Sequence, residues 1–438
     1  MNQNRMILKG NICYSRSLSE LRILEPGYLL CEDGICRGAL EASGGPEALS
    51  EEWRQVPVTD YGGCLIIPGM TDLHLHAPQY EFRGMGMDME LLDWLEQYAF
   101  PAEAGYAKLS YADRAYEGFV EDLKASFTTR ACMFATIHRE SAELLMEKLD
   151  KAGLAALVGK VNMDRNSPDI LREKSPEESA EQTVQWLERT AGRFLQVKPI
   201  LTPRFIPSCS DGLMERLRRL QKAYRIPVQS HLSENPGEIQ WVRELCPESA
   251  CYGDAYDRFG LFGGEDCPTV MAHCVYSDRR EQELMKERGV WAAHCPQSNM
   301  NLSSGIAPVR EFLDRGIKTG LGTDVAGGHS LSMFRAITDA VQASKLYWRL
   351  VDQTKKPLAL EEAFYMATVG GGSFFEAAGF AASGRFEPGQ SMDALVLDDG
   401  PLRASRDYTA RQRLERLIYF DDVRTLKAKY ISGKKVSH

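Results

Sequence analysis

The chain lacks any hydrophobic run long enough to cross a membrane. Its longest apolar stretches, "CLIIPGM" and "GLAALVG", are far shorter than the ~20 residues that a transmembrane helix needs. The amino-terminal stretch "MNQNRMILKGNICYS" also lacks the apolar core of a signal peptide. We therefore expect a cytoplasmic protein that has no membrane partner.

An excess of positive charge and a disulfide pattern are missing as well. The 52 Lys and Arg residues are outnumbered by 61 Asp and Glu residues, which gives a formal net charge of −9. Such a chain is poorly suited to a phosphate backbone, so we expect no nucleic acid polymer as a partner. The 11 cysteines are scattered and contain no Cys-x-x-Cys pair, which favours reduced and mostly buried thiols.

The two ends of the chain share one sequence texture. Residues 1–66 and 385–438 contain short apolar segments separated by Gly, Pro and Ser, a pattern typical of short strands. In "GYLLCEDGICRGAL" the pair Asp33-Gly34 predicts the turn of a hairpin. We expect both ends to build one small β-sandwich domain, because 438 residues suit a large domain with a smaller partner.

Residues 67–384 alternate apolar, strand-like runs with amphipathic helical stretches such as "SAELLMEKLDKAG". Alternating strands and helices favour parallel strands joined by right-handed crossovers. Eight such units predict an α/β fold, a (β/α)₈ TIM-like barrel. The strand-like runs are "CLIIPGMTDLHLH", "TRACMFATIH", "AALVGKVNMD", "LQVKPILTPRF", "IPVQSHLSE", "TVMAHCVY", "GVWAAHCP" and "KTGLGTD".

Histidine is scarce, with eight residues in the chain, yet two of them stand in "TDLHLHAPQY" (71–80). Residues i and i+2 of a strand face the same way, so His74 and His76 share one face. His231, His273 and Asp324 end the fifth, sixth and eighth predicted strands. The carboxyl ends of barrel strands meet at one rim, and imidazoles with a carboxylate suit Zn²⁺ or Fe²⁺. The sequence therefore predicts a metal site at this rim.

These residues stand in motifs that resemble the amidohydrolase superfamily and, within it, the guanine deaminases. The resemblance implies hydrolytic deamination of guanine to xanthine and ammonia by a metal-activated hydroxide, as a step of purine catabolism. It also implies a small-molecule purine base as substrate and a homodimer. The motifs span residues 68–334 and read "PGMTDLHLHAPQYEFRGMGMDMELLDWLEQYAFPAE", "LTPRFIPSCS", "SHLSEN", "AHCVY", "HCPQSNMNLSSG" and "GLGTDVAGGHSLSM".

The resemblance also assigns a metal site. It implies one Zn²⁺ per subunit, with Fe²⁺ as the alternative, held by His74, His76, His231 and Asp324. A second metal would need a bridging group such as a modified lysine on the fourth strand. Lys198 is on that strand but stands six residues before its end, too deep to reach the rim. This spacing favours a single metal.

Three residues have catalytic roles by resemblance. Glu234, three residues beyond His231, would take the proton of the water and deliver it to the ring nitrogen. Asp324 would be a base for the water besides being a ligand. His273 would orient the hydroxide, and a role as a second metal ligand stays open.

Substrate contacts are implied at three further positions, Gln79, Arg204 and Phe205, in addition to His231, Glu234 and Asp324. The Gln79 amide can donate and accept hydrogen bonds. The Arg204 guanidinium can reach O6 or N7 of guanine. Phe205 offers a backbone amide and a ring.

Several alternatives remain on the sequence alone. Another aminohydrolase activity on the same fold, toward 8-oxoguanine, S-adenosylhomocysteine, methylthioadenosine or a triazine, would keep the metal residues and change the pocket. A non-catalytic binding protein would be expected to lose them. Trp94 could line the pocket or a helix core, His294 and His138 are interpreted as structural, and His329 has no assigned role.

Overall fold

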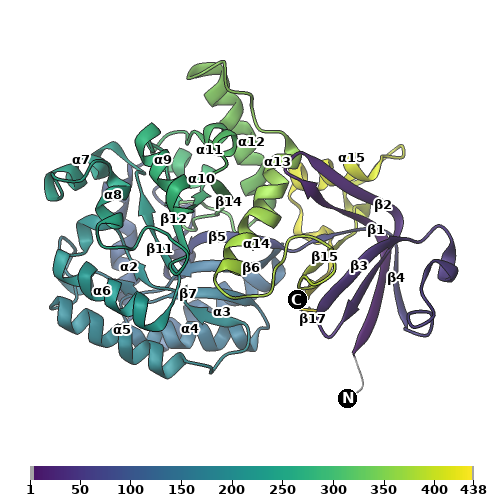
Figure 1. The fold of residues 1–438 in the computed structure, drawn as a ribbon, viewed down its shortest axis with the longest axis horizontal. Coiled ribbons are helices and arrows are strands. Elements are labelled where there is room, and N and C mark those ends of the chain that lie inside the picture. The colour runs from purple at the N-terminus through teal and green to yellow at the C-terminus, as the bar shows by residue number, and fades with distance from the viewer. Residues whose placement is uncertain (1–3, 437–438) are drawn as a thin grey trace.

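The computed structural model describes residues 4–436, so residues 1–3 and 437–438 of the predicted β domain lie outside it. The chain has a mixed α/β architecture in which a ring of strands surrounded by helices lies beside a separate sheet (Figure 1). Within the described part of the chain, none of the helices combines the length and apolarity that crossing a bilayer requires.

Eight parallel strands, here called the strand ring, correspond one to one to the eight predicted runs. They pair in two sheets, β5-β6-β7-β9 and β11-β12-β13-β14. A bridge between Leu201 and Val228 joins the two sheets on one side. The strands are β5 (Met70–His76), β6 (Thr128–Phe134), β7 (Ala155–Gly159), β9 (Val197–Pro199), β11 (Val228–Leu232), β12 (Thr269–His273), β13 (Trp291–His294) and β14 (Lys318–Leu321), with the short pair β8 (Val161–Asn162) and β10 (Thr202–Pro203) at the rim.

Backbone hydrogen bonds join the other side of the ring. The N–H of Asp324 donates to the carbonyl of His74 at 2.8 Å, and the N–H of His76 donates to the carbonyl of Val325 at 2.8 Å. Asp72 adds to this junction, because its carboxylate accepts from the Thr323 N–H and hydroxyl. The last strand therefore delivers its carboxyl end directly beside the two histidines of the first.

Helices cover the outside of the strand ring because their apolar stripes are buried against it. In α6, Ser210 caps the helix by accepting from the Leu213 N–H, and Leu213, Met214 and Leu217 are buried. The helices between the strands are α3 (Leu109–Ala125), α4 (Arg139–Lys151), α5 (Pro176–Thr190), α6 (Asp211–Tyr224), α7 (Pro236–Leu245), α8 (Tyr252–Asp257), α9 (Arg279–Arg288), α10 (Pro296–Asn301) and α11 (Val309–Arg315).

The remaining helices lie at the site and beyond the last strand of the ring. Three consecutive elements, α1 (Leu91–Trp94), the π-helical turn η3 (Leu95–Ala99) and α2 (Phe100–Gly105), form one interrupted helix before α3. A 3₁₀ turn, η2 (Ala77–Phe82), follows β5 directly. The chain continues after β14 through α12 (Met333–Leu350), α13 (Leu360–Tyr365), the π turn η6 (Met366–Gly370), α14 (Gly371–Ala377) and α15 (Ala410–Phe420).

The two ends of the chain form one seven-stranded sheet, in the order β17-β16-β15-β4-β1-β2-β3. The predicted hairpin at Asp33-Gly34 is confirmed, since β2 pairs antiparallel with β3 and both turn residues have positive φ, 52° and 84°. The strands are β1 (Arg5–Ser17), β2 (Glu20–Glu32), β3 (Ile35–Glu41), β4 (Val58–Pro68), β15 (Ala394–Leu397), β16 (Leu426–Ile431) and β17 (Lys434–Val436).

Buried charged side chains join this sheet to the strand ring. Arg130 on β6 donates through Nε to Asp393 Oδ2 at 2.7 Å, and both side chains are at most 2% exposed. Lys429 on β16 donates through Nζ to the carbonyls of Leu123 and Thr128 at 3.1 and 2.7 Å. These contacts fix the sheet against β6 and the end of α3.

Candidate active site

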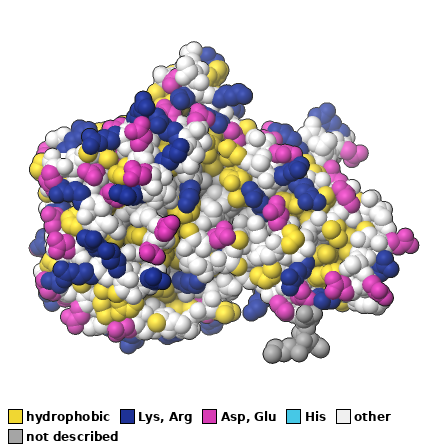
Figure 2. All heavy atoms as spheres, in the orientation of Figure 1, with side chains coloured by type: hydrophobic (Ala, Val, Ile, Leu, Met, Phe, Trp, Pro, Cys, Tyr) yellow, Lys and Arg dark blue, Asp and Glu magenta, His cyan; other side chains and the backbone are white. Residues whose placement is uncertain are grey.

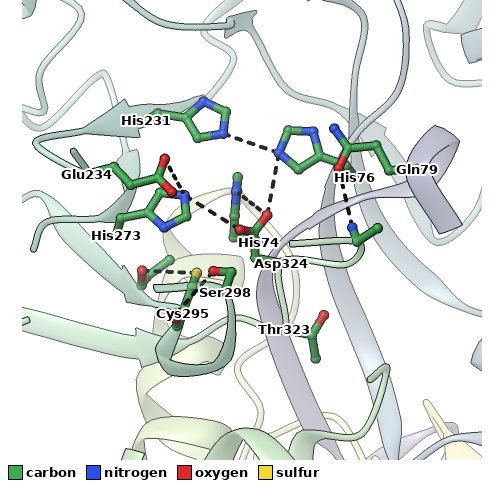
Figure 3. A network of polar contacts seen from close by, with 12 residues as sticks. His74, His76, Gln79, His231, Glu234, His273, Cys295, Ser298, Thr323 and Asp324 are labelled. Atoms are coloured by element: carbon green, nitrogen blue, oxygen red, sulfur yellow. Dashed lines mark hydrogen bonds and ion pairs between the residues drawn. The ribbon is translucent and has the colours of Figure 1, made fainter. Parts of the chain in front are cut away.

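Five side chains converge at the carboxyl ends of the ring strands (Figure 3). His74 and His76 come from β5, His231 from β11, His273 from the end of β12, and Asp324 follows β14 by three residues. His74 Nε2 lies 3.2 Å and His76 Nε2 3.6 Å from Asp324 Oδ1, and His273 Nε2 lies 3.8 Å from Asp324 Oδ2. His76 Nε2 and His231 Nε2 are 3.2 Å apart. The structure thus brings together all five residues that the strand pattern singled out.

The cluster has the donor set of a divalent metal site. Two groups, one of His74, His231 and His273 and one of His74, His76 and Asp324, each place their ligand atoms within 4.8 Å of one another. His74 Nε2 is buried and makes no hydrogen bond. Because a buried ring nitrogen without a partner is costly, the bare nitrogens and the carboxylate around one point fit a cation. The two groups together contain the four predicted ligands and His273.

Neighbouring acceptors orient two of the imidazoles. His231 Nδ1 donates to the carbonyl of Arg204 at 2.7 Å, and His273 Nδ1 donates to Asn299 Oδ1 at 2.9 Å. Each hydrogen bond places the ring proton on Nδ1, which leaves Nε2 as a bare acceptor facing the cluster. Asn299 on α10 was not found by sequence reasoning, although it lies within the motif "HCPQSNMNLSSG".

The electrostatics of the cluster favour neutral imidazoles and an ionised aspartate. Burial lowers the pKa of His74, and it lowers the pKa of His76 and His231 well below the ordinary value. Burial by itself would raise the pKa of Asp324, but the surrounding imidazoles outweigh it and lower that pKa to about 2. Neutral imidazoles and a carboxylate are the protonation states that a metal requires of its ligands.

Glu234 lies beside the cluster as a second buried acid. Its Oε2 is 3.4 Å from His273 Nε2, and its Oε1 accepts from the Ser304 hydroxyl at 3.3 Å. Burial raises the pKa of Glu234 well above the ordinary value, and the charge of Asp324 raises it further. A carboxyl group in this environment can hold a proton near neutral pH and release it to a neighbouring base.

A further buried acid, Glu238 on α7, was missed by sequence reasoning. Glu238 Oε2 accepts from the Glu234 N–H at 3.1 Å, and Glu238 Oε1 accepts from the Tyr252 hydroxyl at 2.7 Å. Burial and the neighbouring Glu234 raise the pKa of Glu238 to about 7. Its position four residues after Glu234, in the first turn of α7, is the feature of the sequence that could have indicated it.

The cluster forms one end of a cavity. Its wall is apolar on the side of the interrupted helix, where Leu91, Leu92, Trp94 and Leu95 line it. Trp94 also donates its indole N–H to the carbonyl of Met85 at 3.0 Å, so it is both part of the lining and fixed in the helix packing. The remaining lining residues are His76, Gln79, Arg204, Phe205, His231, Glu234, Glu238, His273, Leu302 and Asp324.

The structure places the three predicted substrate residues, Gln79, Arg204 and Phe205, in the wall of this cavity. Gln79 lies on η2 directly after β5, and Arg204 and Phe205 follow β10. Gln79 and Arg204 both contact Glu103 of α2, a buried carboxylate that sequence reasoning did not single out. This polar part of the wall is therefore built from two segments that are distant in sequence and that both contact a third, the one that carries Glu103.

The other residues predicted from the sequence do not line this cavity. His294 is buried, lines a separate cavity beside Arg310, and burial lowers its pKa to about 3. Lys198 contacts the carbonyl of Gly379 and the ring of Phe380. His329 is exposed and lies near Asn301 on α10, and His138 stands directly before α4.

The fold and this cluster define a class of proteins. A family model described as "Amidohydrolase family" matches residues 65–436, and the chain belongs to this family.

Full-length relatives make the likeness more specific. The guanine deaminase of Dictyostelium discoideum is 36% identical, with 100% of this chain and 99% of that protein covered. Among solved structures, a guanine deaminase from C. acetobutylicum with bound guanine in the active site has a TM-score of 0.94 and 43% identity, covering 99% of this chain and 100% of that one. The E. coli guanine deaminase has a TM-score of 0.86 and 30% identity, with 99% of each chain covered. The chain is therefore similar to guanine deaminases from end to end.

Proposed function

We propose that this protein is a hydrolase that deaminates guanine to xanthine and ammonia, as a step of purine catabolism. The observation that carries the proposal is the cluster of His74, His76, His231 and Asp324 beside a buried Glu234, in a chain that aligns with guanine deaminases over its full length. The free purine base is the proposed substrate.

The proposed cofactor is one Zn²⁺ per subunit, with Fe²⁺ as the alternative, held by His74, His76, His231 and Asp324. When bound, such a metal supplies Lewis acidity that lowers the pKa of water toward neutrality. A single ion is supported by Lys198, whose ammonium contacts the Gly379 carbonyl rather than the cluster. The choice of a borderline metal is supported by the buried His74 Nε2, which makes no hydrogen bond, and by the Nδ1 hydrogen bond that directs His231 Nε2 toward the cluster.

Three residues of the chain carry the proton transfers. Asp324, ionised at neutral pH, is the base for the attacking water. Glu234 relays one proton of the water to a ring nitrogen of the purine, so that the ring never carries a full negative charge, and Asp324 passes the other proton to the amino group, which leaves as ammonia. His273 Nε2, 3.4 Å from Glu234 Oε2 and 3.8 Å from Asp324 Oδ2, lies between the two acids. From there the imidazole orients the water and the oxygen that is added at C2.

Substrate recognition is assigned to the polar wall and to the cluster itself. Arg204 presents N–H donors that suit O6 or N7 of guanine, and Gln79 presents an amide that suits the adjoining edge. Phe205 has its ring 6.1 Å from that of Trp241 and offers its backbone N–H beside Arg204. His231, Glu234 and Asp324 face the reacting carbon.

A purine panel tests the proposal. Ammonia release and the fall in absorbance are measured with guanine, 8-oxoguanine, adenine and adenosine. Selective conversion of guanine to xanthine is the expected result. Turnover of another purine with no turnover of guanine would support the proposed role of the cluster and contradict the proposed guanine contacts of the pocket.

Metal dependence is tested on the same protein. Chelation should abolish deamination and lower the midpoint of thermal unfolding, because an ion that binds only the folded chain stabilises it. Addition of Zn²⁺ should restore both. Metal analysis of the gently purified protein should give about one ion per chain, as expected from a four-ligand site. Full activity in a metal-free sample would contradict the proposed cofactor.

Three further features are part of the proposal. Residues 1–66 and 385–438 form a composite β-sandwich domain, and residues 67–384 form a (β/α)₈ amidohydrolase barrel.

The protein acts in the cytoplasm as a homodimer. Support for self-association comes from the carboxyl end of α12, which projects from the molecule (Figure 1) and exposes Leu346, Leu350 and Val351 by 47, 75 and 63%. Light scattering would decide between one and two chains.

A further inference from the structure

The motif "FPAE" at residues 100–103 ends in a glutamate that none of the proposed steps uses. Glu103, on α2, is 1% exposed. Its Oε2 accepts from Arg204 Nη1 at 2.6 Å, and its Oε1 accepts from Arg204 Nη2 at 3.0 Å. The same Oε1 accepts from Gln79 Nε2 at 2.8 Å. One buried carboxylate therefore binds two residues of the polar wall.

These contacts fix the orientation of the Gln79 amide. A carboxylate without a proton can only accept, so the nitrogen of the amide faces Glu103. The N–H of Ala326 can only donate, and it lies 3.3 Å from Gln79 Oε1. Both neighbours demand the same orientation, which leaves Gln79 one N–H and one lone pair for a ligand.

The contacts also fix the plane of the Arg204 guanidinium. Two of its five N–H groups bond to Glu103, which leaves three for another acceptor. The guanidinium carbon lies 5.2 Å from the centre of the Phe100 ring, so the same motif supports one face of the group. Glu103 itself is absent from the residues that line the cavity. It can therefore act on a ligand only through Gln79 and Arg204.

We propose that Glu103 is a positioning residue that sets the selectivity of the pocket for purines with an oxygen at C6. Resting on the proposed function, this inference assigns the Glu103 carboxylate to hold the Arg204 donors and the Gln79 amide where they meet the six-membered ring. A bidentate pair of this kind fixes direction as well as distance. Loss of the carboxylate would free both side chains to rotate.

Charge balance supports the same assignment. Arg204 lines a cavity that also contains Glu234, Glu238 and Asp324. Without Glu103, the guanidinium would be free to turn toward these acids, and its donors would leave the substrate edge. The ion pair thus keeps the cation of the recognition wall apart from the acids of the proton-transfer cluster.

The test is Glu103→Gln in the metal-loaded, full-length protein, with kinetics on guanine and 2-aminopurine. The latter has the 2-amino group and no oxygen at C6, and its binding is measured as inhibition of guanine turnover. We expect the KM for guanine to rise about tenfold to a hundredfold, as for a donor displaced by ~1 Å. The inhibition constant for 2-aminopurine should rise by a clearly smaller factor, because this ligand offers N7 but no oxygen at C6 to the displaced donors.

Asp393→Asn is the matched control. It breaks another buried carboxylate–arginine pair, with Arg130, at the junction of the sheet and the strand ring. Both variants should lower the midpoint of thermal unfolding, and only Glu103→Gln should change the ratio of the two constants. Glu103→Asp, which keeps the charge at a shorter reach, should shift the ratio in the same direction by less and serves if Glu103→Gln does not fold.

An unchanged ratio in a folded, metal-loaded variant would overturn the role of Glu103. An equal change of the ratio in Asp393→Asn would overturn it as well. These outcomes differ from a failure of the proposed function, which the wild-type protein alone would reveal by leaving guanine unconverted.

Discussion

At the scale of single residues, two acids of the site have opposite environments. The imidazoles around Asp324 lower its pKa to about 2, whereas burial raises the pKa of Glu234 well above the ordinary value. Two carboxyl groups with pKa values driven apart can take different roles, one as an ionised base and one as a proton carrier. His273 contacts both of them, at 3.8 and 3.4 Å.

Glu234→Gln removes the proton carrier and keeps the shape of the side chain. We expect kcat for guanine to fall by about 10² to 10⁴, because a positioned general acid–base typically contributes that factor. Metal content and the thermal unfolding midpoint should stay close to wild type. Glu244→Gln, the same substitution at an exposed position on α7, is the control and should leave kcat unchanged. Near-wild-type kcat in Glu234→Gln would remove Glu234 from the mechanism.

The residues of the site differ in how far the sequence could predict them. The cluster was predictable because each of its members lies at or near the carboxyl end of a strand, and these ends meet at one edge of a parallel sheet. The role of Glu103 was not predictable, because its contacts with Gln79 and Arg204 span 24 and 101 residues and no repeat pattern in the local sequence indicates them. The same holds for Asn299, which bonds to His273 across 26 residues.

At the scale of elements, α10 links β13 to the centre of the site. Its first residue is Pro296, which suits a helix start because the missing N–H is not needed there. The helix places Asn299, buried, against His273. Both His273 and Asp324 have left-handed backbone conformations, with φ of 72° and 48°, which the surrounding contacts must maintain.

Asn299→Ala tests the contribution of α10. Loss of the oxygen that accepts from His273 Nδ1 frees the imidazole to rotate or to change its tautomer. We expect kcat for guanine to fall about tenfold to a hundredfold, the usual cost of removing such a supporting contact. Asn299→Asp keeps the acceptor oxygen and should recover most of the activity. Met300→Ala, at an exposed position on the same helix, should have no effect on kcat, and an equal loss there would contradict the argument.

Element boundaries were predictable only where the local signal was strong. Each of the eight strand-like runs contains a ring strand, because buried parallel strands read as apolar runs bounded by turns. The segment "LLDWLEQYAFPAE" allowed a helix with Trp94 in its core or a pocket wall that includes Trp94. The structure has two short helices joined by the π turn Leu95–Ala99. This arrangement places Leu91 and Leu95 in the cavity wall and Glu103 behind that wall, in contact with Gln79. Such a turn has no sequence signature of its own and often marks a functional site.

At the scale of the whole molecule, the surface and the interior have different roles. On the face that Figure 2 shows, basic and acidic side chains are interspersed over the helices around the strand ring. The chemistry-bearing residues are buried, and the charges that join the sheet to the ring are buried too. The junction therefore contains ions that water cannot reach, and its stability should depend on their protonation.

Lys429 is the group at this junction whose protonation changes near neutral pH. Burial lowers its pKa from 10.5 to about 7, whereas in the unfolded chain it keeps the ordinary value. Between pH 7 and 10.5 the unfolded chain therefore binds a proton that the folded chain does not. Above pH 10.5 the lysine is neutral in both states and does not lower the free energy of unfolding. As pH falls from 10.5 toward 7 the free energy of unfolding decreases, because the unfolded chain gains a proton that the folded chain does not. Below pH 7 the loss is complete.

Lys429→Met should remove this dependence and be most stabilising, relative to wild type, at pH 6 to about 7, where the folded lysine is charged. The difference in unfolding free energy between the two proteins should shrink as pH rises toward 9, by about 1.4 kcal/mol per unit where the lysine is neutral only in the folded chain. Denaturant unfolding at several pH values measures it. Lys427→Met, at an exposed position on the same strand, should show no comparable dependence. A difference that stayed constant from pH 6 to 9 would mean that the two carbonyls of Leu123 and Thr128 hold Lys429 in its charged form throughout.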